Sequence, residues 1–92
     1  MEEIIIVGGG RVGIRLIDLL NKREDYHITL IDDNKKALSL IKEKYETVDI
    51  VRGNATNKTV LENAGIENAD IIVAATSIDE VNLLIGILSQ GY

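Results

Sequence analysis

The chain has 92 residues, enough for one domain, and we expect residues 1–92 to form a single domain. Its net charge of −5 and its aromatic content of 3% argue against a protein that binds nucleic-acid backbones or stacked bases. The absence of cysteine excludes disulfides, thiolate chemistry and zinc sites built on sulfur. Acidic residues at the N-terminus argue against a signal peptide, and no apolar run suits a bilayer, so we expect no direct membrane insertion.

The first strand-like and helix-like segments alternate. Residues 4–7 are a continuous β-branched run, which predicts a parallel strand buried on both faces. Residues 11–21 predict a helix, and residues 27–31 predict a second strand after a polar turn. The apolar positions of this first helix are Val12, Leu16, Leu19 and Leu20.

A second helix and a third strand follow. Either Asp33 or Asn34 can cap the helix, because both side chains accept hydrogen bonds from backbone N–H groups. The third strand is expected over residues 48–51. The apolar stripe predicted for the second helix consists of Ala37, Leu40, Ile41 and Tyr45.

The third helix is expected to be short. Thr56 or Asn57 can cap it, it runs through Ala64, and Gly65 is its C-terminal stop. A fourth strand is predicted over residues 71–74, where the chain is again continuously apolar.

The last segment predicts a helix over residues 78–90. Residues 77–80 form a capping box, in which a serine and a glutamate satisfy each other's backbone groups. Apolar side chains lie on more than one face of this helix, and the fourth strand has an open edge. We therefore expect either a fragment of a longer protein or an oligomer, although single exposed apolar residues are also common.

These units together predict an α/β fold. Successive parallel strands need right-handed crossovers, so the helices cover both faces of one sheet. We expect a Rossmann-like three-layer (βα)4 parallel sheet with strand order 3-2-1-4, truncated relative to a full dinucleotide-binding fold.

A nucleotide-binding fingerprint lies at the end of the first strand. Gly8, Gly10 and Gly13 follow the G-x-G-x-x-G pattern, and Asp32 ends the second strand. Gly8 allows the turn, Gly10 lets the backbone approach a pyrophosphate, and Gly13 lets the helix pack closely on the strand. Asp32 can accept hydrogen bonds from a ribose diol and repels a 2′-phosphate, so NADP is disfavoured.

Four landmarks resemble one family. They are Gly-Gly-Gly-Arg-Val-Gly, Leu-Ile-Asp-Asp, Gly-Asn-Ala-Thr and Ala-Ala-Thr-Ser-Ile-Asp-Glu-Val-Asn-Leu-Leu. Over nearly its whole length the chain resembles the N-terminal nucleotide-binding (KTN or RCK, TrkA-N) domain of Trk/Ktr-type potassium-uptake regulators. The resemblance implies a cytoplasmic regulatory subunit that binds NAD(H), ATP or ADP, forms homo-oligomers and controls a membrane potassium transporter subunit.

The resemblance also implies candidate ligand contacts. Arg11 matches an arginine that meets phosphates, a role that its planar fork of donors suits. Asn54 departs from the family's usual Gly-Asp-Ala-Thr, so any role that needs a carboxylate there is in doubt. The candidate cofactor-binding residues are Gly8, Gly10, Arg11, Val12, Gly13, Asp32, Asp33, Asn54, Ala55, Thr56, Ala75 and Thr76.

No catalytic set is apparent, so we expect a protein that is not an enzyme, with no metal site. His27, the only histidine, is expected to be a plain strand-boundary residue. The Tyr-x-x-x-Lys pair of short-chain dehydrogenases and the Walker lysine are both absent. Two alternatives remain: the cofactor-binding part of an NAD-dependent dehydrogenase, and a minimal Rossmann fold that does not respond to ligands.

Overall fold

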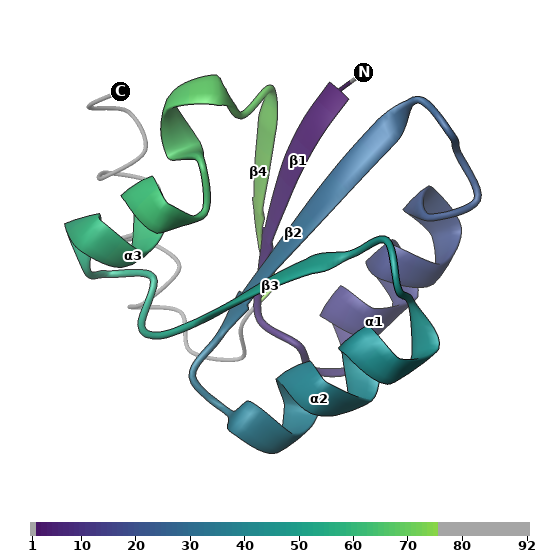
Figure 1. Ribbon diagram of the computed structural model, residues 1–92, viewed down its shortest axis with the longest axis horizontal. Helices are drawn as coiled ribbons and strands as arrows, with labels where there is room; N and C mark the ends of the chain where they lie inside the picture. The colour runs from purple at the N-terminus through teal and green to yellow at the C-terminus, as the bar shows by residue number, and fades with distance from the viewer. Residues whose placement is uncertain (1, 76–92) are drawn as a thin grey trace.

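Four parallel strands form the centre of the molecule, and helices cover both faces of the sheet (Figure 1). The computed structural model describes residues 2–75. The strand order is β3-β2-β1-β4, which confirms the predicted Rossmann-like topology. The elements are β1 (Glu2–Val7), α1 (Arg11–Leu20), β2 (Tyr26–Asp32), α2 (Lys35–Lys44), β3 (Asp49–Arg52), α3 (Lys58–Asn63), the 3-10 turn η1 (Ile66–Asn68) and β4 (Ile71–Ala74).

Strand β1 is central and buried on both faces, as predicted. Side chains alternate along a strand, so Ile4 and Ile6 pack with α1 and α2, whereas Ile5 and Val7 pack with α3. None of these four side chains is more than 4% exposed. The β-branched run therefore contributes to both cores and holds the start of the glycine loop in place.

The strand register brings the carboxyl ends of all four strands to one edge of the sheet. Val7 of β1 pairs with Ile31 of β2 and with Ala74 of β4. At the outer side of the sheet, Asp32 of β2 pairs with Arg52 of β3. Residues that follow these positions in the sequence therefore meet at this edge, which we call the carboxyl edge.

The packing face of α1 differs from the prediction. Gly13 and Ile17 are its buried residues, while Val12 and Leu19 are 60% and 63% exposed. The reason is the close approach at Gly13, which turns that side of the helix toward β1. Leu16 and Leu20, also predicted as apolar positions, are only partly buried against the core.

The predicted stripe of α2 is wrong at one position. Leu40 is 60% exposed, whereas Leu38 and Ile41 are buried against the sheet. Tyr45, just beyond the helix, is buried as predicted. Several apolar residues one or two positions apart make more than one helical face plausible, and packing on the sheet decides between them.

The helix ends follow local hydrogen bonding. Of the two candidate caps of α2, Asn34 accepts from the N–H of Ala37 at 3.1 Å. Of the two candidates for α3, Asn57 accepts from the N–H of Thr59 at 2.8 Å. Gly65 has a φ of +87°, a left-handed conformation that ends α3 as predicted.

The predicted last helix and its capping box lie outside the described residues. No helix within residues 2–75 is long and apolar enough to cross a membrane.

Candidate functional site

The glycine loop begins at the carboxyl end of β1. The N–H of Gly8 donates to the carbonyl of Ile31 at 2.9 Å, so the loop leaves the sheet only after this residue. Gly8 has a φ of +105°, a backbone conformation that residues other than glycine rarely adopt. A Cβ on Gly13 would lie 1.9 Å from the carbonyl oxygen of Gly8. The protein's own packing therefore requires the first and third glycines of the motif.

Gly10 differs from these two glycines. Its φ of −80° is ordinary, and a Cβ built on it meets no described atom within 4 Å. It occupies the N-cap position of α1 but supplies no side-chain acceptor to the first turn. The packing of the described residues therefore gives no reason for glycine here, and backbone N–H groups of the first helical turn remain available to an anion.

Asp32 connects the glycine loop to the turn after β2. Its Oδ2 accepts from the N–H of Gly9, and its Oδ1 accepts from the N–H of Asn34 at 2.8 Å. A carboxylate has about four acceptor positions, so lone pairs remain for a ribose diol. Asp32 thus has a structural role in addition to the ligand role that the sequence predicts.

Sequence reasoning missed Gly9. Its N–H is the donor to Asp32, and a Cβ at this position would lie 3.1 Å from Oδ2 of that carboxylate. The signal was present in the run of three glycines, whose middle member fills a variable position of the motif.

The loop after β3 lies beside Asp32. The N–H of Gly53 donates to the carbonyl of Asp32 at 3.0 Å. The Oδ1 of Asn54 accepts from both the N–H and the hydroxyl of Thr56, at 2.9 and 2.8 Å. Ala55 points its methyl group into the core. Asn54 therefore shapes this loop through its amide oxygen, a role that needs no carboxylate.

The remaining candidates lie around the same edge. Arg11 and Val12 are exposed in the first turn of α1, and Asp33 is exposed after β2. The N–H of Ala75 donates to the carbonyl of Val7 at 2.7 Å, which places Ala75 next to the glycine loop. Thr76 lies outside the described residues.

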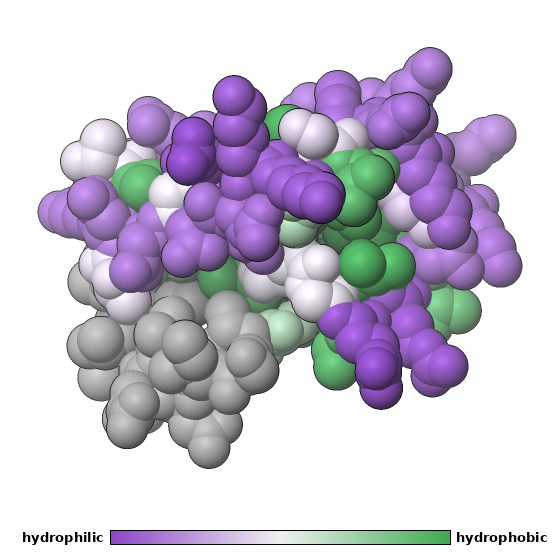
Figure 2. Space-filling model, turned by 90° about the horizontal axis from the view of Figure 1, so that it is seen from below, coloured by the Kyte–Doolittle hydropathy of each residue, from purple (hydrophilic) through white to green (hydrophobic). Residues whose placement is uncertain are grey.

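Figure 2 shows the carboxyl edge face on. Hydrophobic and near-neutral residues gather in the middle of this face, with hydrophilic side chains on either side. The structure thus brings the glycine loop, Asp32, the loop after β3 and Ala75 together at one surface.

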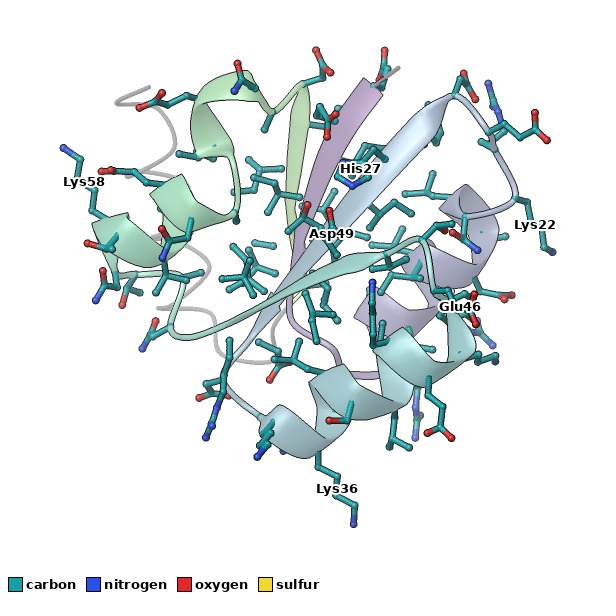
Figure 3. All side chains as sticks on the ribbon, in the orientation of Figure 1. Lys22, His27, Lys36, Glu46, Asp49 and Lys58 are labelled. Carbon is teal, nitrogen blue, oxygen red and sulfur yellow. The ribbon has the colours of Figure 1, made fainter. Side chains whose placement is uncertain are left out.

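His27 is not the plain boundary residue that we expected. Its Nδ1 bonds to Oε2 of Glu3 at 2.5 Å and its Nε2 bonds to Oδ2 of Asp49 at 2.8 Å, which connects β1, β2 and β3. Figure 3 shows His27 and Asp49 together on adjacent strands. The bond to Glu3 raises the pKa of His27 above its ordinary value, and the bond to Asp49 adds to this, although partial burial opposes both.

A cavity of about 750 Å³ opens beside this histidine. Its lining includes Glu3, His27, Asp49, Asn63 and Asn68. The first three lie at the amino ends of the strands, so the cavity is separate from the carboxyl edge. Within residues 2–75, no group of three or more His, Cys, Asp or Glu side chains is arranged to hold a metal ion.

Comparisons with known proteins agree with this geometry. The family model described as the TrkA-N domain matches residues 4–91. A Trk system potassium uptake protein TrkA homolog from Methanothermobacter thermautotrophicus is 39% identical over 89 residues, which are 97% of this chain and 40% of that protein. The TrkA protein of Haemophilus influenzae is 39% identical over 82 residues, 89% of this chain and 18% of that protein. The chain therefore spans less than half the length of these relatives.

Solved structures show the same fold. The NAD(P)-binding domain of an exopolyphosphatase-related protein from Archaeoglobus fulgidus matches with a TM-score of 0.82 and 22% identity, over 99% of this chain and 66% of that one. The Kef C-terminal domain of Shewanella denitrificans in its AMP-bound form matches with a TM-score of 0.82 and 26% identity, over 99% of this chain and 53% of that one.

Proposed function

The chain belongs to the TrkA-N domain family, and from this premise we propose that it is the nucleotide-sensing domain of a potassium-transport regulator. The relatives that it matches over most of its length are named as Trk system potassium uptake proteins. In this proposal the domain works in the cytoplasm as part of a homo-oligomer, beside a membrane potassium transporter subunit.

The observation that carries the proposal is Gly10. The described packing does not require glycine at this position, and the first turn of α1 lies open beneath it. A diphosphate placed there meets backbone N–H groups and the positive end of the helix dipole. Arg11, exposed in the same turn, adds a planar cationic donor.

The ligand that suits this edge contains adenosine and phosphate. NAD(H) is our first choice and ATP or ADP the second, because both place a ribose diol beside Asp32. The AMP-bound Kef domain supports the part that these ligands share, and the NAD(P)-binding neighbour supports a dinucleotide. A 2′-phosphate would lie against the carboxylate of Asp32, so NADP(H) is disfavoured.

In this proposal the domain binds the nucleotide as a regulatory ligand and does not convert it to a product. A ligand that binds one arrangement of paired domains more tightly than another shifts the population toward that arrangement. The transporter subunit responds to this shift, and no chemical step on the nucleotide is needed.

Titration calorimetry tests the proposal. We expect NADH, ADP or ATP to bind the full chain with a dissociation constant below about 1 mM. NADPH should bind more weakly than NADH because of Asp32. The proposal fails if none of these nucleotides binds in this range.

A further inference from the structure

Arg52 is a cationic side chain at the carboxyl edge that the nucleotide motifs do not include. It is the last residue of β3, it pairs in register with Asp32, and it is exposed. Its Nε donates to the carbonyl of Asp33 at 3.4 Å, a long bond, and the ion pairs Arg23–Asp25, His27–Glu3 and His27–Asp49 do not involve it. Most of its five N–H donors and the plane of its guanidinium are therefore available beside the ribose position.

The described residues offer no aromatic ring at this edge. The chain has no Phe or Trp, and its described tyrosines lie elsewhere. Tyr26 lies at the amino end of β2 with the guanidinium of Arg23 over its ring. Tyr45 is buried beyond α2, where its hydroxyl donates to Asp18 at 2.9 Å. Among the described residues, a base bound beside Asp32 therefore has no aromatic ring to stack on, and a different planar group is needed.

Lys36 does not supply such a group. Lys36, in the first turn of α2, points away from the ribbon (Figure 3). An ammonium is also a compact charge without a plane, whereas a guanidinium is planar, weakly hydrated and stacks on aromatic faces. Arg52 is thus a planar cation that the strand register places next to Asp32, whereas Arg11 lies at the phosphate position.

Resting on the proposed nucleotide site, we propose that Arg52 forms the base subsite, with its guanidinium stacked on the adenine ring while Asp32 binds the ribose. Asn54, two residues further along, completes the subsite. Its Oδ1 already accepts two hydrogen bonds from Thr56, which assigns the oxygen to the loop and leaves Nδ2 as a donor. That donor suits an adenine ring nitrogen, which accepts hydrogen bonds.

The base contribution is measured with two ligands that share a phosphate and a ribose. NMR chemical-shift titrations of the full chain with AMP and with ribose 5-phosphate give the two affinities. Wild-type protein should bind AMP at least about fivefold more tightly, since stacking of the base adds to the affinity. Arg52→Gln should weaken AMP binding about 3- to 10-fold and leave ribose 5-phosphate unchanged.

Two further variants separate stacking from charge. Arg52→Lys keeps the charge without the plane and should bind AMP as weakly as Arg52→Gln. Arg23→Gln removes the same charge at the turn before β2 and should leave both affinities unchanged.

Three results would overturn this inference while leaving the nucleotide site intact. They are equal wild-type affinities for the two ligands, an equal loss for both in Arg52→Gln, and full AMP binding in Arg52→Lys. Absence of binding of NADH, ADP and ATP to the wild-type protein would instead refute the proposed function itself.

Discussion

At the scale of single residues, Asp32 has an observed structural role beside its proposed ligand role. The motif predicts a carboxylate for a ribose diol. The structure adds backbone N–H bonds from Gly9 and Asn34, which hold the glycine loop against the turn after β2. The proposed ribose contact and the observed loop geometry therefore depend on the same side chain.

Replacement of Asp32 by Asn should expose both roles. An amide offers one oxygen, so one of the two backbone N–H groups loses its acceptor and faces an amide donor instead. We expect a loss of about 1–3 kcal/mol in the free energy of unfolding and weaker NADH binding. Urea denaturation and calorimetry measure the two effects.

Asp33→Asn is the matched control for this variant. The side chain of Asp33 is exposed, and the hydrogen bond from Arg52 goes to its backbone carbonyl rather than to its carboxylate. Asp33→Asn removes one negative charge and should leave the free energy of unfolding unchanged. Equal stability of Asp32→Asn and wild type would contradict the structural role of Asp32.

Residue roles that depend on local sequence were predictable, and those that depend on distant partners were not. Gly8 is constrained by its positive φ and Gly13 by its close approach to the carbonyl of Gly8, five residues earlier, so the motif alone identifies them. Gly9 and Arg52 become neighbours of Asp32 only because β1, β2 and β3 lie side by side in the sheet.

At the scale of elements, the strands were easier to predict than the helix faces. A buried parallel strand needs only a continuous apolar run, which β1 shows clearly. The face that a helix buries depends on how closely it approaches the sheet. The contact at Gly13 rotates α1 so that Val12 and Leu19 are exposed, and no periodicity in the sequence specifies that contact.

The connection of β1, β2 and β3 through His27 is a second element-level feature that local patterns miss. Glu3 lies 24 residues before His27 and Asp49 lies 22 residues after it. Only the parallel register makes them neighbours. Lys42, from the α2 side, lines the same cavity.

This connection predicts a pH dependence of stability. The pKa of His27 is raised in the folded protein because Glu3 and Asp49 stabilise its protonated form there. The unfolded chain lacks these two contacts. The stabilisation is fully present below the unfolded pKa of about 6.5 and is lost as pH rises through the higher folded value.

Urea midpoints between pH 5.5 and pH 9 check this expectation. Wild-type stability should decline across the window relative to His27→Gln, whose side chain does not titrate. Arg23→Gln, which keeps the histidine, should decline like the wild type. Parallel curves for wild type and His27→Gln would show that the histidine contributes no pH-dependent stability.

At the scale of the whole molecule, the sheet separates two polar regions. The carboxyl edge collects the glycine loop, Asp32, Arg52 and the loop after β3. The opposite end holds His27 and its two carboxylates. The strand order, predicted from alternating strands and helices, explains why residues far apart in sequence meet at the carboxyl edge.

The central claim is that a nucleotide phosphate lies against Gly10, and one substitution tests it most directly. Gly10→Ala adds a methyl group where the described structure has room, so the free energy of unfolding should stay within about 1 kcal/mol of wild type. NADH affinity should fall about tenfold or more, because the methyl group occupies the position of the phosphate.

Gly13→Ala is the contrast, because its Cβ would collide with the carbonyl of Gly8 and should destabilise the protein itself. Calorimetric titration of NADH into Gly10→Ala is therefore the decisive measurement. A folded Gly10→Ala protein with a strongly weakened affinity is the predicted result, and a folded protein with wild-type affinity would contradict the account.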